Sequence, residues 1–158
     1  MTALIRNPGD GRMAGVAGDI YTIKVSGSET GGSVALIEAI VPPGGGPPPH
    51  RHTREDETFY ILDGELEIVA DGEKATAGTG ATVLLPKGSV HQFKNSGKTA
   101  ARMLILVAPA GLEEFFAEVS QEPGTFSENN PPAIDPSQIE KMLALAPEYG
   151  LEIIPPDH

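Results

Sequence analysis

The chain has 158 residues, the length of a single domain, and it carries 22 acidic against 11 basic side chains, a formal net charge of −11. A field of that sign repels phosphate backbones and anionic membranes, so neither nucleic acid nor a membrane is expected as a partner. The absence of cysteine excludes disulfides, thiolate metal sites and cysteine nucleophiles, so any bound metal must be held by nitrogen and oxygen.

Short strands separated by turns are predicted over most of the chain. The expected strands cover residues 20–25, 33–41, 58–62, 65–70, 81–85, 90–94 and 101–108. Asp63-Gly64 and Asp71-Gly72 are both interpreted as hairpin signals. Strands of this length and spacing predict an all-β, antiparallel sandwich or barrel over about residues 19–108. The apolar run at 103–108 does not alternate, which predicts a strand covered on both faces.

The hydrophobic period changes after Pro109. One helix is predicted by apolar residues at helical spacing, namely Leu112, Phe115, Phe116 and Val119. A second helix is expected after Asp135, with Pro136 at its first position and Gln138 completing a capping box. The apolar stripe of this second helix comprises Ile139, Met142, Leu143 and Ala146. Two helices over about residues 110–150 are therefore expected to follow the barrel within one domain, residues 1–158.

No segment predicts export or membrane insertion. The N-terminal segment lacks an apolar core of signal-peptide length. The longest apolar stretch, Met103 to Leu112, is about half of the roughly 20 residues that a membrane helix needs. The chain is therefore expected to be cytoplasmic.

Three of the four histidines stand beside Gly/Pro turns in the strand-rich region. His50 and His52 are two residues apart, so in an extended segment both imidazoles project to one face and can meet one metal. Alone, such a pair more often lies on the surface than binds a metal. Glu57 follows with a carboxylate, and His91 opens a distant strand. This donor set suits divalent Fe, Mn, Ni, Co, Cu or Zn. His158, the last residue, is given no role.

The spacing of these residues closely resembles the two motifs of the cupin superfamily. The first motif is matched by Gly44, His50, His52, Glu57 and Gly64. The second motif is matched by Gly80, Pro86, Gly88, His91 and Asn95. The resemblance implies a cupin-type β-barrel, or jelly roll, with one divalent transition metal inside its mouth. It also implies that the metal ligands are His50, His52, Glu57 and His91.

Two acidic neighbours compete with Glu57 for the carboxylate position. The motif spacing favours Glu57. Glu55 and Asp56 are therefore interpreted as part of a solvated, charged rim. Arg51 and Arg54 belong to the same rim.

Four protein ligands leave one or two metal positions open to water, O₂ or a chelating substrate. Glu57 is also expected to act as the general base, because the histidines are used as ligands and no other acid–base group is evident inside the barrel. Strand parity makes Phe59, Ile61 and Phe93 candidates for substrate contact, although for each of them plain barrel core is at least an equal interpretation. Apolar walls suit a flat chelating substrate better than a sugar phosphate.

The segment at residues 101–119 resembles single-domain bacterial cupins related to quercetin 2,3-dioxygenases. The residues that carry this resemblance are Gly111, Leu112, Glu113, Phe115 and Phe116. It implies a metal-dependent dioxygenase acting with O₂ on a small enol or flavonol-like substrate. The alternatives are a non-catalytic small-molecule-binding cupin and a metal-dependent isomerase or decarboxylase. The apolar strand at 103–108 and the dimeric habit of similar cupins predict a homodimer.

Overall fold

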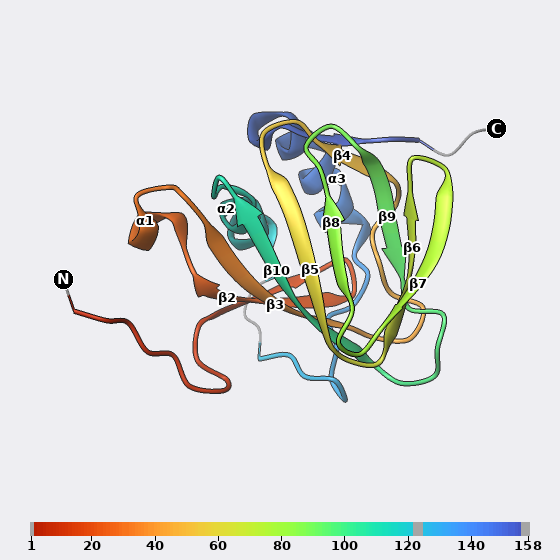
Figure 1. Ribbon diagram of the computed structural model, residues 1–158, viewed down its shortest axis with the longest axis horizontal. Helices are drawn as coiled ribbons and strands as arrows, with labels where there is room; N and C mark the ends of the chain where they lie inside the picture. The colour runs from red at the N-terminus through yellow and green to blue at the C-terminus, as the bar shows by residue number, and fades with distance from the viewer. Residues whose placement is uncertain (1, 122–124, 156–158) are drawn as a thin grey trace.

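The computed structural model describes residues 2–121 and 125–155, and within them the strands form two antiparallel sheets (Figure 1). The first sheet, in spatial order, consists of β1 (Arg12–Val16), β2 (Asp19–Val25), β3 (Ala35–Val41), β10 (Ala101–Ala108), β5 (Asp56–Asp63) and β8 (Thr82–Leu85). The second consists of β11 (Leu151–Ile153), β4 (His50–His52), β9 (Val90–Lys94), β6 (Glu65–Ala70) and β7 (Glu73–Gly78). The predicted antiparallel all-β barrel is confirmed, and β6, β9 and β10 have the predicted bounds.

The inward faces of the two sheets form the core. The buried residues of β3 and β10 are Ala35, Ile37, Ala39, Val41, Ala101, Met103, Ile105 and Val107. Residues between them face outward, and Leu106 is exposed. The prediction that the 103–108 strand is covered on both faces is therefore wrong for the single chain. Apolar side chains on its outer face hide the alternation from a reading of the sequence.

The two Asp-Gly turns differ in what they connect. Asp71-Gly72 joins β6 to β7 in a two-residue hairpin, with φ of 48° and 86° at the two turn residues. Asp63-Gly64 is not a hairpin, because β5 and β6 belong to different sheets. A Cβ at Gly64 would lie 3.1 Å from the Cα of Ala101, so glycine is needed where the chain crosses between sheets. The dipeptide signals a local turn but not which strands pair.

Both predicted C-terminal helices are confirmed as α2 (Leu112–Val119) and α3 (Pro136–Leu145). The Asp135 side chain caps α3 by accepting the N–H of Ser137 at 2.9 Å. Gln138 does not complete the predicted capping box. Its Nε2 is buried and donates to the carbonyl oxygens of Gly15 at 2.7 Å and Val119 at 2.9 Å. Gln138 therefore ties α3 to β1 and α2.

Several elements lie outside the predicted ones. β1 precedes the expected start of the barrel, a short helix α1 (Gly27–Thr30) links β2 to β3, and β11 follows a 3₁₀ turn, η1 (Ala146–Tyr149). β4 and β7 also lie outside the predicted strand ranges. β11 pairs with β4 in the register Leu151 to His52 and Ile153 to His50. The C-terminal segment thus completes the sheet that carries the paired histidines. His158 lies outside the described residues, and none of the described helices has the length and apolarity needed to cross a membrane.

Candidate metal centre

Four buried side chains converge inside the barrel: His50 and His52 from β4, Glu57 from β5 and His91 from β9. Each side chain offers one nitrogen or oxygen donor atom, and these four atoms lie within 4.8 Å of one another. The two histidines of β4 share a face because they are two residues apart in a strand. His91 joins them because it pairs directly with His50 across β4 and β9. The structure thus brings together all four residues that the sequence singled out.

The contacts among these side chains leave polar atoms unsatisfied. Nε2 of His52 lies 3.6 Å from Oε2 of Glu57, and Nε2 of His91 lies 3.2 Å from Oε1 of Glu57. Neither nitrogen has a well-aligned hydrogen-bond partner among the described residues, and both are buried. Buried polar atoms without partners are rare in native proteins. Three imidazoles and a carboxylate are ligands that suit a divalent transition metal, and the imidazole nitrogens without hydrogen-bond partners are free to bind it.

For His50 and Glu57 the electrostatics favour the protonation states that bind a metal. Burial lowers the pKa of His50 to about 4, helped by the neighbouring His52 and His91, so His50 is neutral at physiological pH. Burial by itself would raise the pKa of Glu57, but His52 and His91 outweigh it and hold that pKa below its usual value. Glu57 is therefore a carboxylate, and neutral imidazole with carboxylate is the ligand form required.

Two further contacts orient the imidazoles from outside the cluster. Nδ1 of His50 lies 2.9 Å from the carbonyl oxygen of Pro48, and Nδ1 of His52 lies 2.8 Å from Oε1 of Glu55. Burial opposes protonation of His52, but the carboxylates of Glu57 and Glu55 raise its pKa. The Pro48 carbonyl fixes the direction of the His50 ring in this way and leaves its other nitrogen for the metal. Nδ1 of His52 and Oε1 of Glu55 are close but not aligned as a hydrogen bond.

The prediction that Glu55 belongs to a solvated, charged rim is wrong. Glu55 is 3% exposed rather than solvated, because the bend after β4 turns it back against His52. A carboxylate three residues beyond a candidate ligand histidine was the available signal for this role. Asp56 is exposed, as expected, and accepts the backbone N–H of Lys87 at 2.8 Å.

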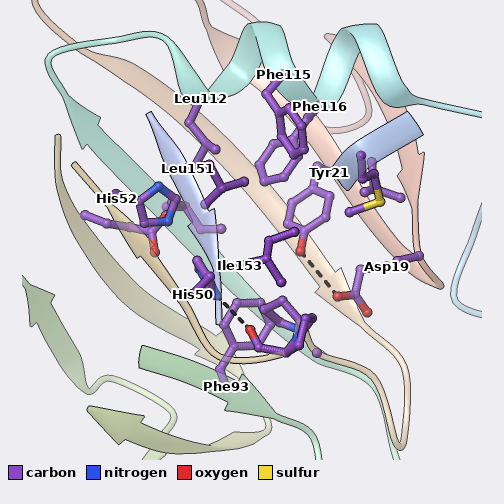
Figure 2. Close-up of a pocket in the computed structure, with 18 of the residues that line it drawn as sticks. Asp19, Tyr21, His50, His52, Phe93, Leu112, Phe115, Phe116, Leu151 and Ile153 are labelled. Atoms are coloured by element: carbon purple, nitrogen blue, oxygen red, sulfur yellow. Dashed lines mark hydrogen bonds and ion pairs between the residues drawn. The ribbon is translucent and has the colours of Figure 1, made fainter. Parts of the chain in front are cut away.

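A cavity of about 260 Å³ lies beside the cluster, with His50, His52 and Glu57 in its wall (Figure 2). The rest of its lining is mostly apolar and includes Tyr21, Phe93, Leu112, Phe115, Phe116, Ile139, Met142, Leu151 and Ile153. The rings of Tyr21 and Phe116 stack with centroids 4.0 Å apart. None of the described residues that line the cavity is lysine or arginine. A small, flat, apolar ligand suits such walls.

The three residues predicted to contact substrate occupy different positions. Phe93 lines the cavity. Phe59 and Ile61 are fully buried on the inward face of β5 and lie outside the cavity lining. Phe59 packs edge-to-face on Phe93, with centroids 5.5 Å apart, so it supports the wall from behind. Contact of any of the three with a substrate stays a prediction.

Comparison with known proteins identifies the central part of the chain. Residues 37–107 match the Cupin domain family. The polyketide synthase CurC of Streptomyces cyaneus is 29% identical over 71% of this chain and 73% of its own length. Quercetin 2,3-dioxygenase of Bacillus subtilis is 25% identical over 68% of this chain and 32% of its own length. Beyond CurC, the chain spans less than two thirds of the length of the first curated relatives it matches.

A solved structure extends the likeness to the fold. The structure of a predicted oxalate decarboxylase from Thermotoga maritima superimposes with a TM-score of 0.61. The two chains are 20% identical, and the match covers 68% of this chain and 99% of that one. At this identity the likeness concerns the barrel rather than its chemistry.

Proposed function

Because residues 37–107 match the Cupin domain family, we propose that the chain is a metal-dependent dioxygenase acting with O₂ on a small, planar enol or flavonol-like substrate. The observation that carries the proposal is a buried three-histidine, one-glutamate cluster beside an apolar cavity, with three of its four residues in the cavity wall. The likeness to quercetin 2,3-dioxygenase of Bacillus subtilis supports the same reaction class.

The residues of the cluster have two roles: all four would hold a metal ion, and Glu57 would also accept a proton. A divalent ion held by the four side chains would supply open positions for a chelating enolate and for O₂. Glu57 is charged at neutral pH and lies in the cavity wall, so it is placed to accept the enol proton. General-base catalysis of this kind contributes about 10²–10⁴-fold to a rate.

The cavity walls select the substrate. Phe93 and the stacked Tyr21–Phe116 pair present aromatic surface, which packs well against a planar ring system. A phosphorylated sugar would require a cationic partner, and the described lining residues include no lysine or arginine. An isomerase that acts on sugar phosphates is therefore disfavoured.

Oxygen uptake tests the proposed reaction. The metal-reconstituted protein is mixed with a panel of flavonols and simpler enols, and O₂ consumption is followed together with the loss of flavonol absorbance. The proposal expects the two to fall in equal molar amounts. If the protein binds a flavonol but consumes no O₂ with any of the reconstituted metals, the dioxygenase proposal is contradicted. A small-molecule-binding protein would then be supported instead.

A second candidate function is a non-oxidative reaction on an aromatic polyketide-like substrate. The observation that favours it is the match to CurC, a protein named polyketide synthase, over 73% of the length of that protein. Hydroxylated rings would fit the same apolar cavity. Product formed at an undiminished rate under anaerobic conditions would favour this function over the dioxygenase.

A further inference from the structure

The C-terminal part of the chain forms one wall of the cavity beside the metal cluster. Four apolar side chains of this part line the cavity, two from α3 and two from β11: Ile139, Met142, Leu151 and Ile153. Both elements lie outside residues 37–107, the part of the chain that matches the Cupin domain family. What this wall does must therefore be inferred from its own residues.

The pairing of β11 with β4 places apolar side chains directly beside two candidate metal ligands. Leu151 lies opposite His52, and Ile153 lies opposite His50. Directly opposed residues of antiparallel strands point to the same face, with their Cβ atoms about 4.5–5.5 Å apart. In the view of Figure 2, Leu151 and Ile153 stand between the two histidines and Tyr21. A molecule bound to a metal in the cluster would therefore lie against β11.

The apolar faces of the two C-terminal helices are covered to different degrees. In α2, the side chains of Leu112, Phe115 and Val119 are at most 3% exposed and belong to the core. In α3, Ile139 and Met142 are only half-buried, and both line the cavity. Apolar surface that the fold leaves partly uncovered beside a cavity is surface that a ligand can bury, at a gain in binding free energy.

Polar contacts hold α3 against the barrel. Besides the bonds from its Nε2 to β1 and α2, Gln138 accepts the N–H of Ala17 at its Oε1, at 3.0 Å. Nζ of Lys141 donates to the carbonyl oxygen of Glu118 at 2.7 Å. These bonds fix the helix whether or not a ligand is bound. An apolar wall that is already in place binds a ligand without the cost of ordering the wall.

We propose that β11 and α3 form an apolar subsite for the aromatic arm of a metal-chelating ligand, and that Ile153 and Met142 determine the selectivity for that arm. A chelator without an arm would contact the metal, whereas one with an aromatic arm would also bury this wall. The inference rests on the proposed function for its ligand class, but it concerns binding and requires no turnover.

Two chelators that share one metal-binding group test the subsite. Maltol and 3-hydroxyflavone both chelate through a 3-hydroxy-4-pyranone, and only 3-hydroxyflavone carries aromatic rings beyond it. Affinities for the zinc-loaded protein are measured by calorimetric titration, because zinc has no redox chemistry and binding is then read without turnover. The wild type is expected to bind 3-hydroxyflavone about 100-fold or more tightly than maltol, from burial of the additional rings.

Variants of the wall separate the subsite from the metal cluster. Ile153→Ala and Met142→Ala remove apolar contact area, so each should lower the affinity for 3-hydroxyflavone about tenfold and that for maltol far less. The matched controls are Ile154→Ala and Leu145→Ala. Ile154 and Leu145 are also half-buried but lie outside the cavity lining, so both controls should keep the wild-type preference. Thermal melts establish that each variant is folded.

Each outcome decides one question. Equal affinity of the wild type for the two chelators, or an unchanged preference in both Ile153→Ala and Met142→Ala, would overturn the subsite without touching the dioxygenase. Equal weakening of both chelators by these variants would also overturn it, because the metal cluster would then be disturbed. A selective loss of 3-hydroxyflavone binding without O₂ uptake in any metal form would support the subsite and overturn the dioxygenase. Failure of the wild type to bind either chelator would overturn both the subsite and the ligand class.

Discussion

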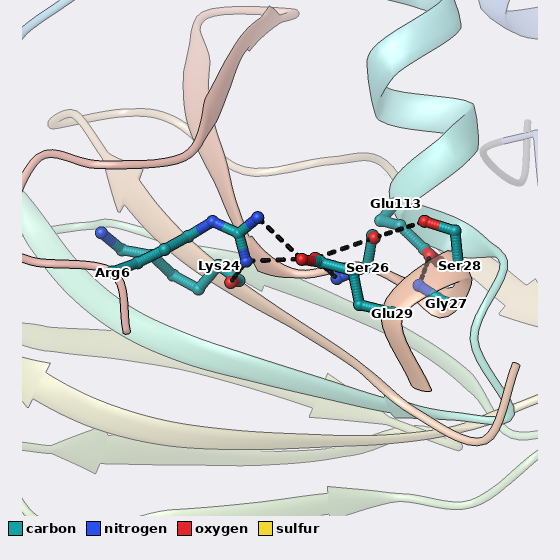
Figure 3. A network of polar contacts seen from close by, with 7 residues as sticks. All are labelled: Arg6, Lys24, Ser26, Gly27, Ser28, Glu29 and Glu113. Atoms are coloured by element: carbon teal, nitrogen blue, oxygen red, sulfur yellow. Dashed lines mark hydrogen bonds and ion pairs between the residues drawn. The ribbon is translucent and has the colours of Figure 1, made fainter. Parts of the chain in front are cut away.

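Glu57 and Glu113 are both buried carboxylates of this protein, and their surroundings differ. Glu113 is the second residue of α2 and is 1% exposed. Its Oε2 accepts the N–H of Gly27 at 3.0 Å, and its Oε1 accepts the N–H of Gly111. Figure 3 shows it joined to α1, beside the Arg6–Glu29 ion pair. Glu57 is 3% exposed, and its two oxygens lie near the imidazole nitrogens of His52 and His91.

The difference separates a structural group from a functional one. Glu113 has backbone donors for both oxygens, so the fold itself satisfies it. Glu57 faces the Nε2 atoms of His52 and His91, which have no hydrogen-bond partners among the described residues. A set of donor atoms that the fold leaves unsatisfied is completed by a ligand. Burial alone would not have told the two carboxylates apart.

The largest effect is expected from Glu57→Gln. The amide keeps an oxygen donor and nearly the same shape, but it cannot accept the enol proton. Metal should be largely retained, while O₂ consumption falls by about 10²–10⁴-fold. His52→Ala should lose metal and activity together. Metal content and O₂ uptake are measured on the same preparations, and full turnover by metal-loaded Glu57→Gln would show that the base lies elsewhere.

Asp19 is a third buried carboxylate. Its contribution to the free energy of unfolding depends on pH. Its pKa in the folded protein is about 7, against 3.8 for the ordinary side chain. Because the folded-state pKa is raised, the stabilising contribution of neutral Asp19 is complete below about pH 4 and is lost as the pH rises through 7. Between pH 4 and pH 8 the wild type should lose up to about 4 kcal/mol of unfolding free energy relative to Asp19→Val. Urea unfolding at both pH values measures this loss. A constant difference would contradict the perturbed pKa.

Glu113→Gln should reduce stability and spare the metal centre. The amide places an N–H₂ group against a backbone N–H, so one buried hydrogen bond is lost and two donors face each other. The unfolding free energy should fall by about 2 kcal/mol, and metal content should not change. Urea denaturation measures the first and elemental analysis the second. Unchanged stability would show that the two backbone contacts contribute little.

The outer surface of the first sheet also carries side chains that a partner could cover. Leu106, Thr58 and Leu84 lie in one row across β10, β5 and β8, and Leu84 is 62% exposed. The predicted homodimer stays a prediction, and this apolar row is where a second copy would pack. Sedimentation should show a dimer that Leu84→Lys weakens, while Glu73→Lys, on the exposed β7, does not. A monomeric wild type at all micromolar concentrations would rule the dimer out.

The sequence was sufficient where local pattern determines structure. Apolar runs and the turn signals between them predicted the bounds of β6, β9 and β10. The spacing of the HxH pair, Glu57 and His91 predicted a cluster that the structure brings together. These features depend on neighbours along the chain or on motif spacing.

Features that depend on distant pairing were not predicted. Asp63-Gly64 has the local form of a hairpin, but which strands pair depends on the rest of the barrel. Asp19 and Tyr21 reach the cavity only because β2 lies beside β3. β11 borders the histidine strand because the chain returns after α3. None of these contacts leaves a periodic signal in the sequence.

Elemental analysis of the protein purified without added metal tests the four-residue centre most directly. The account predicts about one transition-metal ion per chain in the wild type and in Glu113→Gln, and almost none in His52→Ala. A wild type that stays metal-free after incubation with each of Fe²⁺, Mn²⁺, Co²⁺, Ni²⁺, Cu²⁺ and Zn²⁺ would contradict it. Undiminished metal in His52→Ala would contradict it equally.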